Sequence, residues 1–266
     1  MTAAASPAAG RVKRSGSGKV RLKTPDDIQR IREAGSVIAE LFRHIERLSL
    51  VGLTTWDIDS LIETVILRKK GRPAFKTVPG YRFASCIACN HEVVHGIPSR
   101  KKKITRGDLV KIDVGVALNG FFADACRTFI AGSGSPEAQR LVEAARTALS
   151  RGIEAARPGG RIGDIGHSIQ AFVEDMGYSV VRTFTGHGVG FSLHEPPVVP
   201  HYGRKGTGMV LREGMVLAIE PMINAGRHDV RILEDGWTAV TVDGSLSAHF
   251  EHTVAITPEG PLILTE

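Results

Sequence analysis

The spacing of apolar residues changes along this chain, from a helical period near the N-terminus to denser, strand-like runs after residue 108. Between residues 24 and 70 the apolar positions recur every three to four residues, which predicts two amphipathic helices. Thr24 followed by Pro25 is typical of a helix start, because threonine caps the first turn and proline fits its first position. The second helix is expected to stop at Lys70-Gly71, since glycine commonly ends helices. Ordered structure is therefore expected to begin near residue 22.

A β-hairpin is predicted around Asn119-Gly120. Residues 108–131 form two strand-like runs on either side of this dipeptide, which supplies the positive φ angles of a two-residue turn. In that register Asp113 faces Cys126, and Asp124 lies two residues along on the same face. Diagonal neighbours of this kind have Cβ atoms roughly 7–8 Å apart, so two carboxylates are expected close together.

The order of elements then repeats. Helix-like runs are followed by strand-like runs at residues 136–156, 163–176, 215–223 and 250–256. Short motifs return at one offset, Gly52…Asp57 as Gly159…Asp164 and Gly107…Asp113 as Gly214…Glu220. Another returns at nearly the same offset, Arg30…Glu33 as Arg140…Glu143. So nearly constant an offset predicts an α+β fold of two duplicated halves, each with two helices and an antiparallel sheet. The helices would cover one face and leave the other open around a pseudo-twofold axis.

Composition excludes several classes of protein. The 266 residues are 42% hydrophobic and 23% charged, which is ordinary for a globular chain and argues against wholesale disorder or a coiled coil. No apolar run approaches the ~18 residues of a membrane helix, and the N-terminus lacks an apolar signal-peptide stretch. Three cysteines do not make a disulfide scaffold in a chain of this length. A cytoplasmic protein is expected.

The net charge of +6 comes from the N-terminal segment. Residues 1–23 carry six basic residues and no acid, and the remaining 28 basic residues match the 28 acidic ones. We therefore expect a basic, flexible extension over residues 1–21 and a folded domain over residues 22–266. The extension is interpreted as a solvated leader, with a transit peptide and an electrostatic arm as alternatives.

Five residues point to metal chemistry. Asp113 and Glu220 occupy matched positions of the repeat inside apolar runs, where an unpaired charge would cost several kcal/mol. Asp124, Glu251 and a glycine-flanked His187 complete an oxygen-rich set with one imidazole. Such a set suits a pair of divalent ions such as Mn, Fe, Co or Zn. Taken singly, each residue could instead be an ion-pair partner or a core histidine.

These residues lie within motifs that resemble those of the type I methionine aminopeptidases, subfamily A of peptidase family M24. The motifs follow the family's order over about residues 22–264 and are His95-Gly96-Ile97-Pro98, Lys111-Ile112-Asp113-Val114-Gly115, Asp124, Arg127-Thr128-Phe129, Gly186-His187-Gly188-Val189-Gly190, His194-Glu195-Pro196, Ile219-Glu220-Pro221-Met222, Asp235-Gly236-Trp237 and Glu251-His252-Thr253. The resemblance implies the two-halved pita-bread fold, which agrees with the repeat.

The resemblance also implies a role for each matched position. Asp113 would chelate one metal ion, Asp124 and Glu251 would bridge two ions, and His187 with Glu220 would bind the other. Two Lewis-acid cations would activate water for attack on the first peptide bond, with Glu220 passing the proton to the leaving amine.

Two further histidines are implied to contact the substrate rather than a metal ion. His194 would hydrogen-bond the carbonyl oxygen as it becomes an oxyanion, and His95 would hold the scissile amide nitrogen.

The methionine pocket implied by the family is apolar and aromatic, with candidates Phe75, Tyr81, Cys86, Leu193 and Trp237. This chain departs from the family at two positions. Val78 stands where a second tyrosine is common, and Leu193 where an aromatic residue is common.

The spacing of Cys86 and Cys89 next to His91 also resembles a zinc or redox motif. The pocket interpretation is favoured, because no second cysteine pair follows.

Two alternatives share the fold: proline-specific aminopeptidases or prolidases, and metal-free binding modules. The first usually carry a large additional N-terminal domain, for which residues 1–21 leave no room, and the second would lack metal ligands that are present here. Type II enzymes insert a helical segment between the last two ligands. In this chain those positions are Glu220 and Glu251, which are too close in sequence to hold such a segment.

The sequence therefore predicts a monomeric enzyme. It would remove N-terminal methionine from nascent proteins whose second residue is small, and its basic tail could touch the ribosome transiently.

Overall fold

The structure is a computed structural model and describes residues 18–266. The helices are α1 (Pro25–Glu46), α2 (Thr55–Arg68), α3 (Pro136–Ala155), α4 (Ile162–Asp175) and the 3₁₀-helix η1 (Ala74–Thr77). The strands are β1 (Arg72–Pro73), β2 (Cys86–Cys89), β3 (Glu92–Val94), β4 (Leu109–Leu118), β5 (Phe121–Ile130), β6 (Ser179–Val180), β7 (Gly186–Gly188), β8 (Glu195–Val199), β9 (Val216–Ile219), β10 (Met222–Asn224), β11 (Val230–Ile232), β12 (Ala239–Thr241), β13 (Ser247–His249), β14 (His252–Thr257) and β15 (Gly260–Ile263).

The predicted helices form where their caps place them. The hydroxyl of Thr24 accepts a hydrogen bond from the backbone of Asp27, and Asp27 accepts one in return from the backbone of Thr24, which makes a capping box. Thr54 and Asp57 form the same box at the start of α2. Each box satisfies backbone N–H groups that the first helical turn leaves without a partner. Both helix predictions are confirmed.

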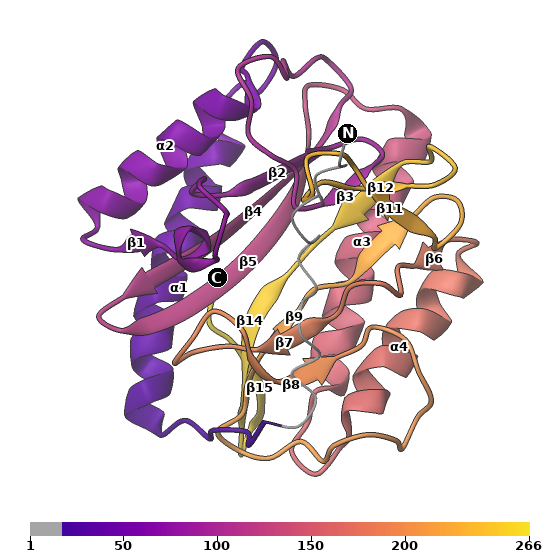
Figure 1. The fold of residues 1–266 in the computed structure, drawn as a ribbon. Coiled ribbons are helices and arrows are strands. Elements are labelled where there is room, and N and C mark those ends of the chain that lie inside the picture. The colour runs from indigo at the N-terminus through magenta and orange to yellow at the C-terminus, as the bar shows by residue number, and fades with distance from the viewer. Residues whose placement is uncertain (1–17) are drawn as a thin grey trace, which may run out of the picture.

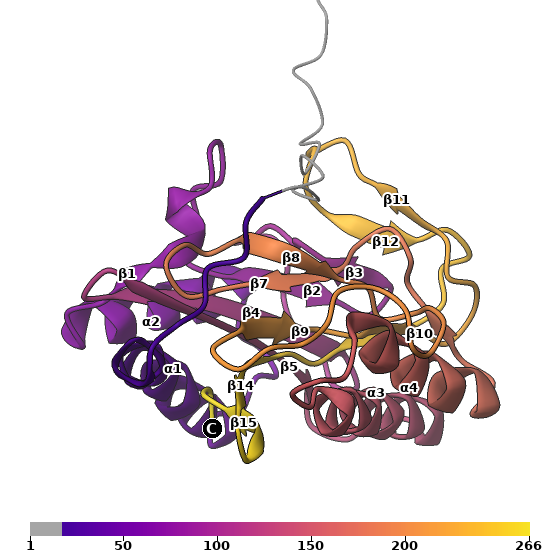
Figure 2. The ribbon, with the colours of Figure 1, turned by 90° about the horizontal axis from the view of Figure 1, so that it is seen from below.

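The four helices lie along one side of the molecule and the strands along the other (Figure 1, Figure 2). β4 pairs with β1, β2 and β5 in the first half, and the order β15-β14-β9-β7-β8 forms a sheet in the second. Two smaller sheets have the orders β13-β10-β6 and β11-β12-β3. A core below α1 and α2 and another below α3 and α4 hold the helices against these sheets. The predicted α+β architecture with one helix-covered face is confirmed.

The repeat predicted from sequence is visible in the backbone hydrogen bonds. Gly52 donates to Ile104 and Gly159 to Leu211, and the two pairs are related by the same offset as the sequence motifs. β1 pairs with β4 as β6 pairs with β10, again at that offset for every position of the register. The two halves therefore share one local structure.

The hairpin is confirmed, with Asn119 and Gly120 at φ angles of 50° and 85° and Asp113 opposite Cys126. One part of the strand prediction is wrong. Glu220 and Glu251 do not lie inside strands, because β9 ends at Ile219 and β14 begins at His252. Pro221 has no N–H for a sheet ladder, so the second half breaks where β4 continues.

The N-terminal segment from Gly18 packs against the domain. Val20 contacts the core of the second half, and Lys23 donates its backbone N–H to Gly214. The predicted extension thus includes four residues, 18–21, that the structure describes, whereas its other residues lie outside the described part. No helix within residues 18–266 is long and apolar enough to cross a membrane.

Candidate metal centre and active site

Four predicted carboxylates approach one another where the two halves meet. Asp113 lies in β4 and Asp124 in β5, whereas Glu220 and Glu251 stand at the breaks of the second half. Glu251 exchanges backbone hydrogen bonds with Cys126, at 2.9 and 3.4 Å. The backbone of Asp124 exchanges two with the Thr253 hydroxyl, at 2.8 and 2.9 Å. These contacts join β5 to β14 and to the residue before it, and they hold Asp124 and Glu251 in the cluster.

His187 completes the cluster from β7. Its Nδ1 donates a hydrogen bond to the carbonyl oxygen of Gly188 at 3.0 Å. In the neutral ring Nε2 is therefore unprotonated, and its lone pair is free to bind a cation. Nε2 lies 3.4 Å from Oε1 of Glu220. Asp124, His187 and Glu251 each offer one ligand atom, and these atoms lie within 4.8 Å of one another. An oriented neutral imidazole of this kind is typical of a metal ligand.

Ionising all the carboxylates of this buried cluster without a cation would cost free energy of folding. Burial raises the pKa of Asp124 to about 7. Burial, together with the charge of Asp124, holds the pKa values of Asp113, Glu220 and Glu251 well above their usual range. Asp113, Asp124 and Glu251 each keep one buried oxygen that no group within residues 18–266 hydrogen-bonds. Buried, unbonded carboxylate oxygens are rare, so this donor set fits divalent cations.

The free protein is expected to lose stability as pH rises from 6.5 to 8. A carboxylate with a raised pKa binds more protons in the folded than in the unfolded chain, so folding weakens as pH climbs through the folded pKa. Asp124 alone would contribute about 1 kcal/mol over this window. Lys111, whose pKa burial lowers to about 8, and the buried histidines with lowered pKa values act in the opposite direction, the histidines near pH 6.5 and Lys111 near pH 8. Asp113, Glu220 and Glu251, whose pKa values are held well above their usual range, act in the same direction as Asp124.

Thermal unfolding in chelator and in excess Mn²⁺ checks this. The midpoint should fall by a few degrees in chelator and hold steady with Mn²⁺. A midpoint that rises with pH in chelator would contradict the expectation.

His194 and His95 lie beside the cluster on separate loops. The ring of His194 stands edge-on to His187, with 4.5 Å between the centroids; the residue as a whole is exposed, and partial burial of its imidazole lowers its pKa. His95 packs edge-on against Phe184, at 5.2 Å between the centroids, and burial with the nearby His194 lowers the pKa of His95 to about 4. His95 is therefore neutral near pH 7 and able to donate or accept one hydrogen bond.

The five predicted pocket residues form one apolar cluster, together with Ala74, Ala117 and the partly buried Val78. Tyr81 packs edge-on against Trp237, with 5.0 Å between ring centroids. Gly115 stands opposite Asp124 on the β4–β5 ladder, and a Cβ there would lie 3.0 Å from Phe75 and 3.2 Å from Leu193. The absence of that carbon lets both side chains pack beside the carboxylates.

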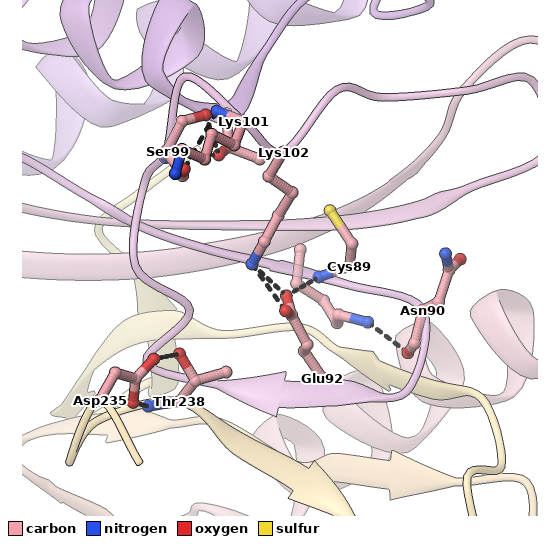
Figure 3. A network of polar contacts seen from close by, with 10 residues as sticks. Cys89, Asn90, Glu92, Ser99, Lys101, Lys102, Asp235 and Thr238 are labelled. Carbon is pink, nitrogen blue, oxygen red and sulfur yellow. Dashed lines mark hydrogen bonds and ion pairs between the residues drawn. The ribbon is translucent and has the colours of Figure 1, made fainter. Parts of the chain in front are cut away.

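Trp237 is held by a polar turn at the end of the β11–β12 hairpin. Asp235 accepts hydrogen bonds from the backbone of Trp237 and Thr238 at 2.8 Å, and from the Thr238 hydroxyl at 2.6 Å. Figure 3 shows this turn together with a nearby ion pair, in which Nζ of Lys102 donates to Oε1 of Glu92 at 2.6 Å. A tight turn of this kind limits the positions that the Trp237 ring can take.

Cys86 and Cys89 do not share a site. They stand three residues apart on β2, so their side chains point to opposite faces, Cys86 to the pocket and Cys89 to the core of the first half. Both are free thiols.

Two histidines beside Glu220 were not predicted from the sequence, because they lie outside the motifs. His201 accepts the backbone N–H of Glu220 on Nε2 at 3.0 Å, and Nε2 of His249 lies 3.8 Å from Oε2 of Glu220. Burial lowers the pKa of each to about 3, so both are neutral.

The pseudo-twofold symmetry could have identified His249 as a site residue. His249 follows Asp124 in sequence by the same interval as Thr253 follows Thr128. The backbone of His249 exchanges two hydrogen bonds with the Thr128 hydroxyl, as that of Asp124 does with the Thr253 hydroxyl. His249 therefore occupies the pseudo-twofold equivalent of a predicted bridging ligand.

A buried ammonium also ties the halves together next to the centre. Lys111 is almost completely buried in β4, two residues before Asp113. Its Nζ donates to the carbonyl oxygens of Asn90 at 2.7 Å and Ser247 at 2.9 Å. The second bond links β4 to β13, so this cation stabilises the junction that carries the carboxylates.

Comparison with protein families shows where this arrangement belongs. The model of metallopeptidase family M24 matches residues 29–258, most of the chain. The chain belongs to metallopeptidase family M24. The resemblance stated from the sequence motifs is therefore confirmed.

Individual M24 relatives agree. The methionine aminopeptidase of Clostridium acetobutylicum is 45% identical over 244 residues, which cover 92% of this chain and 98% of that protein. The crystal structure of methionine aminopeptidase from Thermotoga maritima matches with a TM-score of 0.91 at 45% identity, over 93% of this chain and all of that one. The prolidase from Pyrococcus furiosus matches with a TM-score of 0.73 at 27% identity, over 92% of this chain and 65% of that one. The pita-bread fold is thus confirmed.

Proposed function

We propose that this chain removes the N-terminal methionine from nascent proteins and peptides whose second residue is small, by hydrolysing the first peptide bond. The observation that carries the proposal is the convergence of the predicted ligand side chains beside an apolar pocket. The 45% identity to methionine aminopeptidases over nearly their whole length supports the same activity. The ligand set serves hydrolysis, and the pocket serves recognition of a thioether side chain.

The donor set is proposed to hold two divalent cations, Co, Mn, Fe or Zn. Asp113 would bind one ion, His187 and Glu220 the other, and Asp124 and Glu251 would be shared. When bound, such cations polarise a carbonyl group and lower the pKa of water. The three unbonded buried oxygens support this assignment.

The remaining residues are proposed to act on the substrate directly. Glu220, whose pKa burial raises, would accept a proton from the attacking water and pass it to the leaving amine. His194 would donate a hydrogen bond to the carbonyl oxygen as negative charge develops there. His95 would hold the scissile amide nitrogen. The pocket of Phe75, Tyr81, Cys86, Leu193 and Trp237 would enclose the methionine side chain.

The alternative functions predict different products. A proline-specific enzyme would release the residue before proline, and a binding module would release nothing. The experiment incubates the Mn²⁺-loaded protein with Met-Ala-Ser and Ala-Pro-Ser peptides and identifies the free amino acid. Release of methionine alone supports the proposal, whereas release of alanine from the proline peptide would overturn it.

The second residue of the substrate is expected to control the rate. It must pass between the carboxylate cluster and the wall that contains His95, so a bulky side chain should clash there. We expect kcat/KM for Met-Leu-Ser to be lower than for Met-Ala-Ser by ~10²-fold, a few kcal/mol of transition-state binding. Steady-state kinetics on the two peptides checks this, and equal values would contradict it.

Location and assembly are proposed from the composition of the chain and from its cysteines. All three cysteines are free, and Cys86 and Cys126 are buried, which suits a reducing cytoplasm. We propose that the protein works there as a monomer.

The basic extension is proposed to bring the enzyme near ribosomal RNA by contacts with phosphate groups. Arg11, Lys13 and Arg14 carry its charge before Gly18, and phosphate contacts do not depend on base sequence. A protein starting at Gly18 is the sharpest comparison, because residues 18–21 pack against the domain. We expect the full chain to co-sediment with ribosomes more than this truncation at low salt, and both to cleave Met-Ala-Ser equally. Equal sedimentation would leave the extension as a solvated leader.

A further inference from the structure

A short segment before α1 crosses the second half of the molecule and reaches the loop that carries His194. We call residues 18–23 the strap and residues 190–195 the His194 loop. Figure 2 shows the strap in indigo, running from its first described residue to α1. The backbone N–H of Lys23 donates to Gly214 at 2.7 Å, and the guanidinium carbon of Arg21 lies 3.9 Å from the ring centroid of Phe191. The strap is therefore anchored at two points.

A buried ion pair links the strap to the His194 loop. Nζ of Lys23 donates to Oε2 of Glu195 at 2.7 Å, and the two side chains are only 1% and 7% exposed. Water therefore cannot replace either partner. Removing one partner of such a pair leaves an uncompensated charge, which is strongly destabilising.

The other oxygen of Glu195 shapes the loop. Oε1 accepts the backbone N–H groups of Phe191 at 2.5 Å and Ser192 at 2.7 Å. Glu195 thereby closes a tight turn around Leu193 and His194, which lie between the two bonded N–H groups and Glu195 itself. The position of Lys23 therefore bears on both side chains through a single carboxylate.

Two glycines show how closely the strap fits. A Cβ on Gly190 would lie 2.8 Å from Cε of Lys23 and 2.7 Å from Ile31, and a Cβ on Gly214 would lie 2.7 Å from the carbonyl oxygen of Lys23. These distances are shorter than real Cβ contacts, so a larger residue at Gly214 would displace the backbone of the strap, and one at Gly190 would displace the side chain of Lys23 or Ile31. The lysine is held in one place by the surrounding backbone.

We propose that Lys23 is a positioning residue for His194, acting through Glu195 and the turn that Glu195 closes. The inference rests on the proposed function, because it assigns a catalytic contribution to His194. Lys23 touches no reacting atom. It holds the Glu195 carboxylate where both of its oxygens are bonded, and this fixes the loop from which the imidazole reaches the substrate. Small displacements of such a group are costly, since about 1 Å can reduce turnover 10²-fold.

The test is a double-mutant cycle between Lys23→Met and His194→Ala, with kcat measured on Met-Ala-Ser. Lys23→Met keeps a side chain of similar length, removes the charge and should lower kcat by about tenfold or more. In the His194→Ala background the same change should alter kcat by less than about twofold, because the group it positions is already gone. An equal loss in both backgrounds would overturn the proposal.

Two controls separate positioning from general destabilisation. Lys69→Met breaks an exposed ion pair of the same residue types, between Lys69 at the C-terminal end of α2 and Glu40 on α1 at 2.6 Å. It should leave kcat unchanged. Lys23→Met combined with Glu195→Gln removes both charges while the amide oxygen can still accept the two loop N–H groups. This pair should recover most of the turnover, because the Glu195→Gln side chain can still close the turn. If Lys23→Met does not fold, low turnover of the folded double variant would overturn the proposal.

Hydrogen exchange supplies a readout that needs no activity. The amides of Phe191 and Ser192 should exchange faster in Lys23→Met than in the wild type. In Lys69→Met they should exchange at the wild-type rate. Unchanged exchange would overturn the proposal. A wild-type protein that fails to release methionine would instead overturn the proposed function, so the two failures are distinguishable.

Discussion

Replacing Asp124 by asparagine is expected to abolish peptide hydrolysis while making the metal-free protein more stable. Asp124 is 3% exposed, one of its oxygens is unbonded, and burial raises its pKa to about 7. The amide keeps the shape of the side chain and removes a buried charge that repels Asp113, Glu220 and Glu251. The same change removes a negatively charged group that is proposed to bind metal, since a carboxylate oxygen of Asp124 lies within 4.8 Å of the candidate ligand atoms of His187 and Glu251.

Thermal unfolding with and without Mn²⁺ measures both effects. A ligand at a thousand times its Kd stabilises a protein by about 4 kcal/mol, which is on the order of 10 °C for a chain of this size. The wild type should show that rise in midpoint, and Asp124→Asn should begin higher in chelator and gain almost nothing from Mn²⁺.

Asp59→Asn is a matched control. Asp59 is also 3% exposed, but its Oδ1 already accepts three hydrogen bonds from Ala84 and Ser85, outside the cluster. This variant should keep the rise with Mn²⁺. A normal metal response, or full turnover, in Asp124→Asn would show that Asp124 is not a ligand.

Much of the fold could be predicted because its signals are local. Thr24 and Thr54 cap their helices by contacts three residues away, and Asn119-Gly120 makes a hairpin from two residues. The repeat gave the pseudo-twofold arrangement, since equal offsets imply equal local structures. The strand breaks at Glu220 and Glu251 were not predicted, because the apolar runs around these residues look continuous. Pro221 is the local signal for the first break, since proline has no N–H for a strand ladder.

The site was predictable where chemistry concentrates in motifs and not where it depends on distant contacts. The predicted ligands and pocket residues come together, but nothing local marks His201 or His249 as neighbours of Glu220. Lys23 and Glu195 are separated by 172 residues, and a lysine before a helix looks like any solvated charge. Only the folded chain shows that this lysine is buried.

Replacing His194 by alanine is expected to lower kcat strongly while the metal content stays unchanged. His194 stands beside the cluster rather than in it, since Asp124, His187 and Glu251 supply the converging ligand atoms. Removing one hydrogen-bond donor to a developing oxyanion typically costs ~2.7–4 kcal/mol, or about 10²–10³-fold in kcat. KM should change little, because the bond strengthens mainly in the transition state.

The metal content separates this role from that of a ligand. Loss of the imidazole removes an edge-on contact with His187, 4.5 Å between centroids. His187 should nevertheless keep its orientation, because its Nδ1 remains bonded to the carbonyl oxygen of Gly188 and its own strand pairs with β8 and β9. His167→Ala, on the exposed face of α4, is the control for simple loss of a histidine. Elemental analysis of His194→Ala should therefore match the wild type and His167→Ala, and metal lost from His194→Ala alone would mean that His194 binds the cation rather than the substrate.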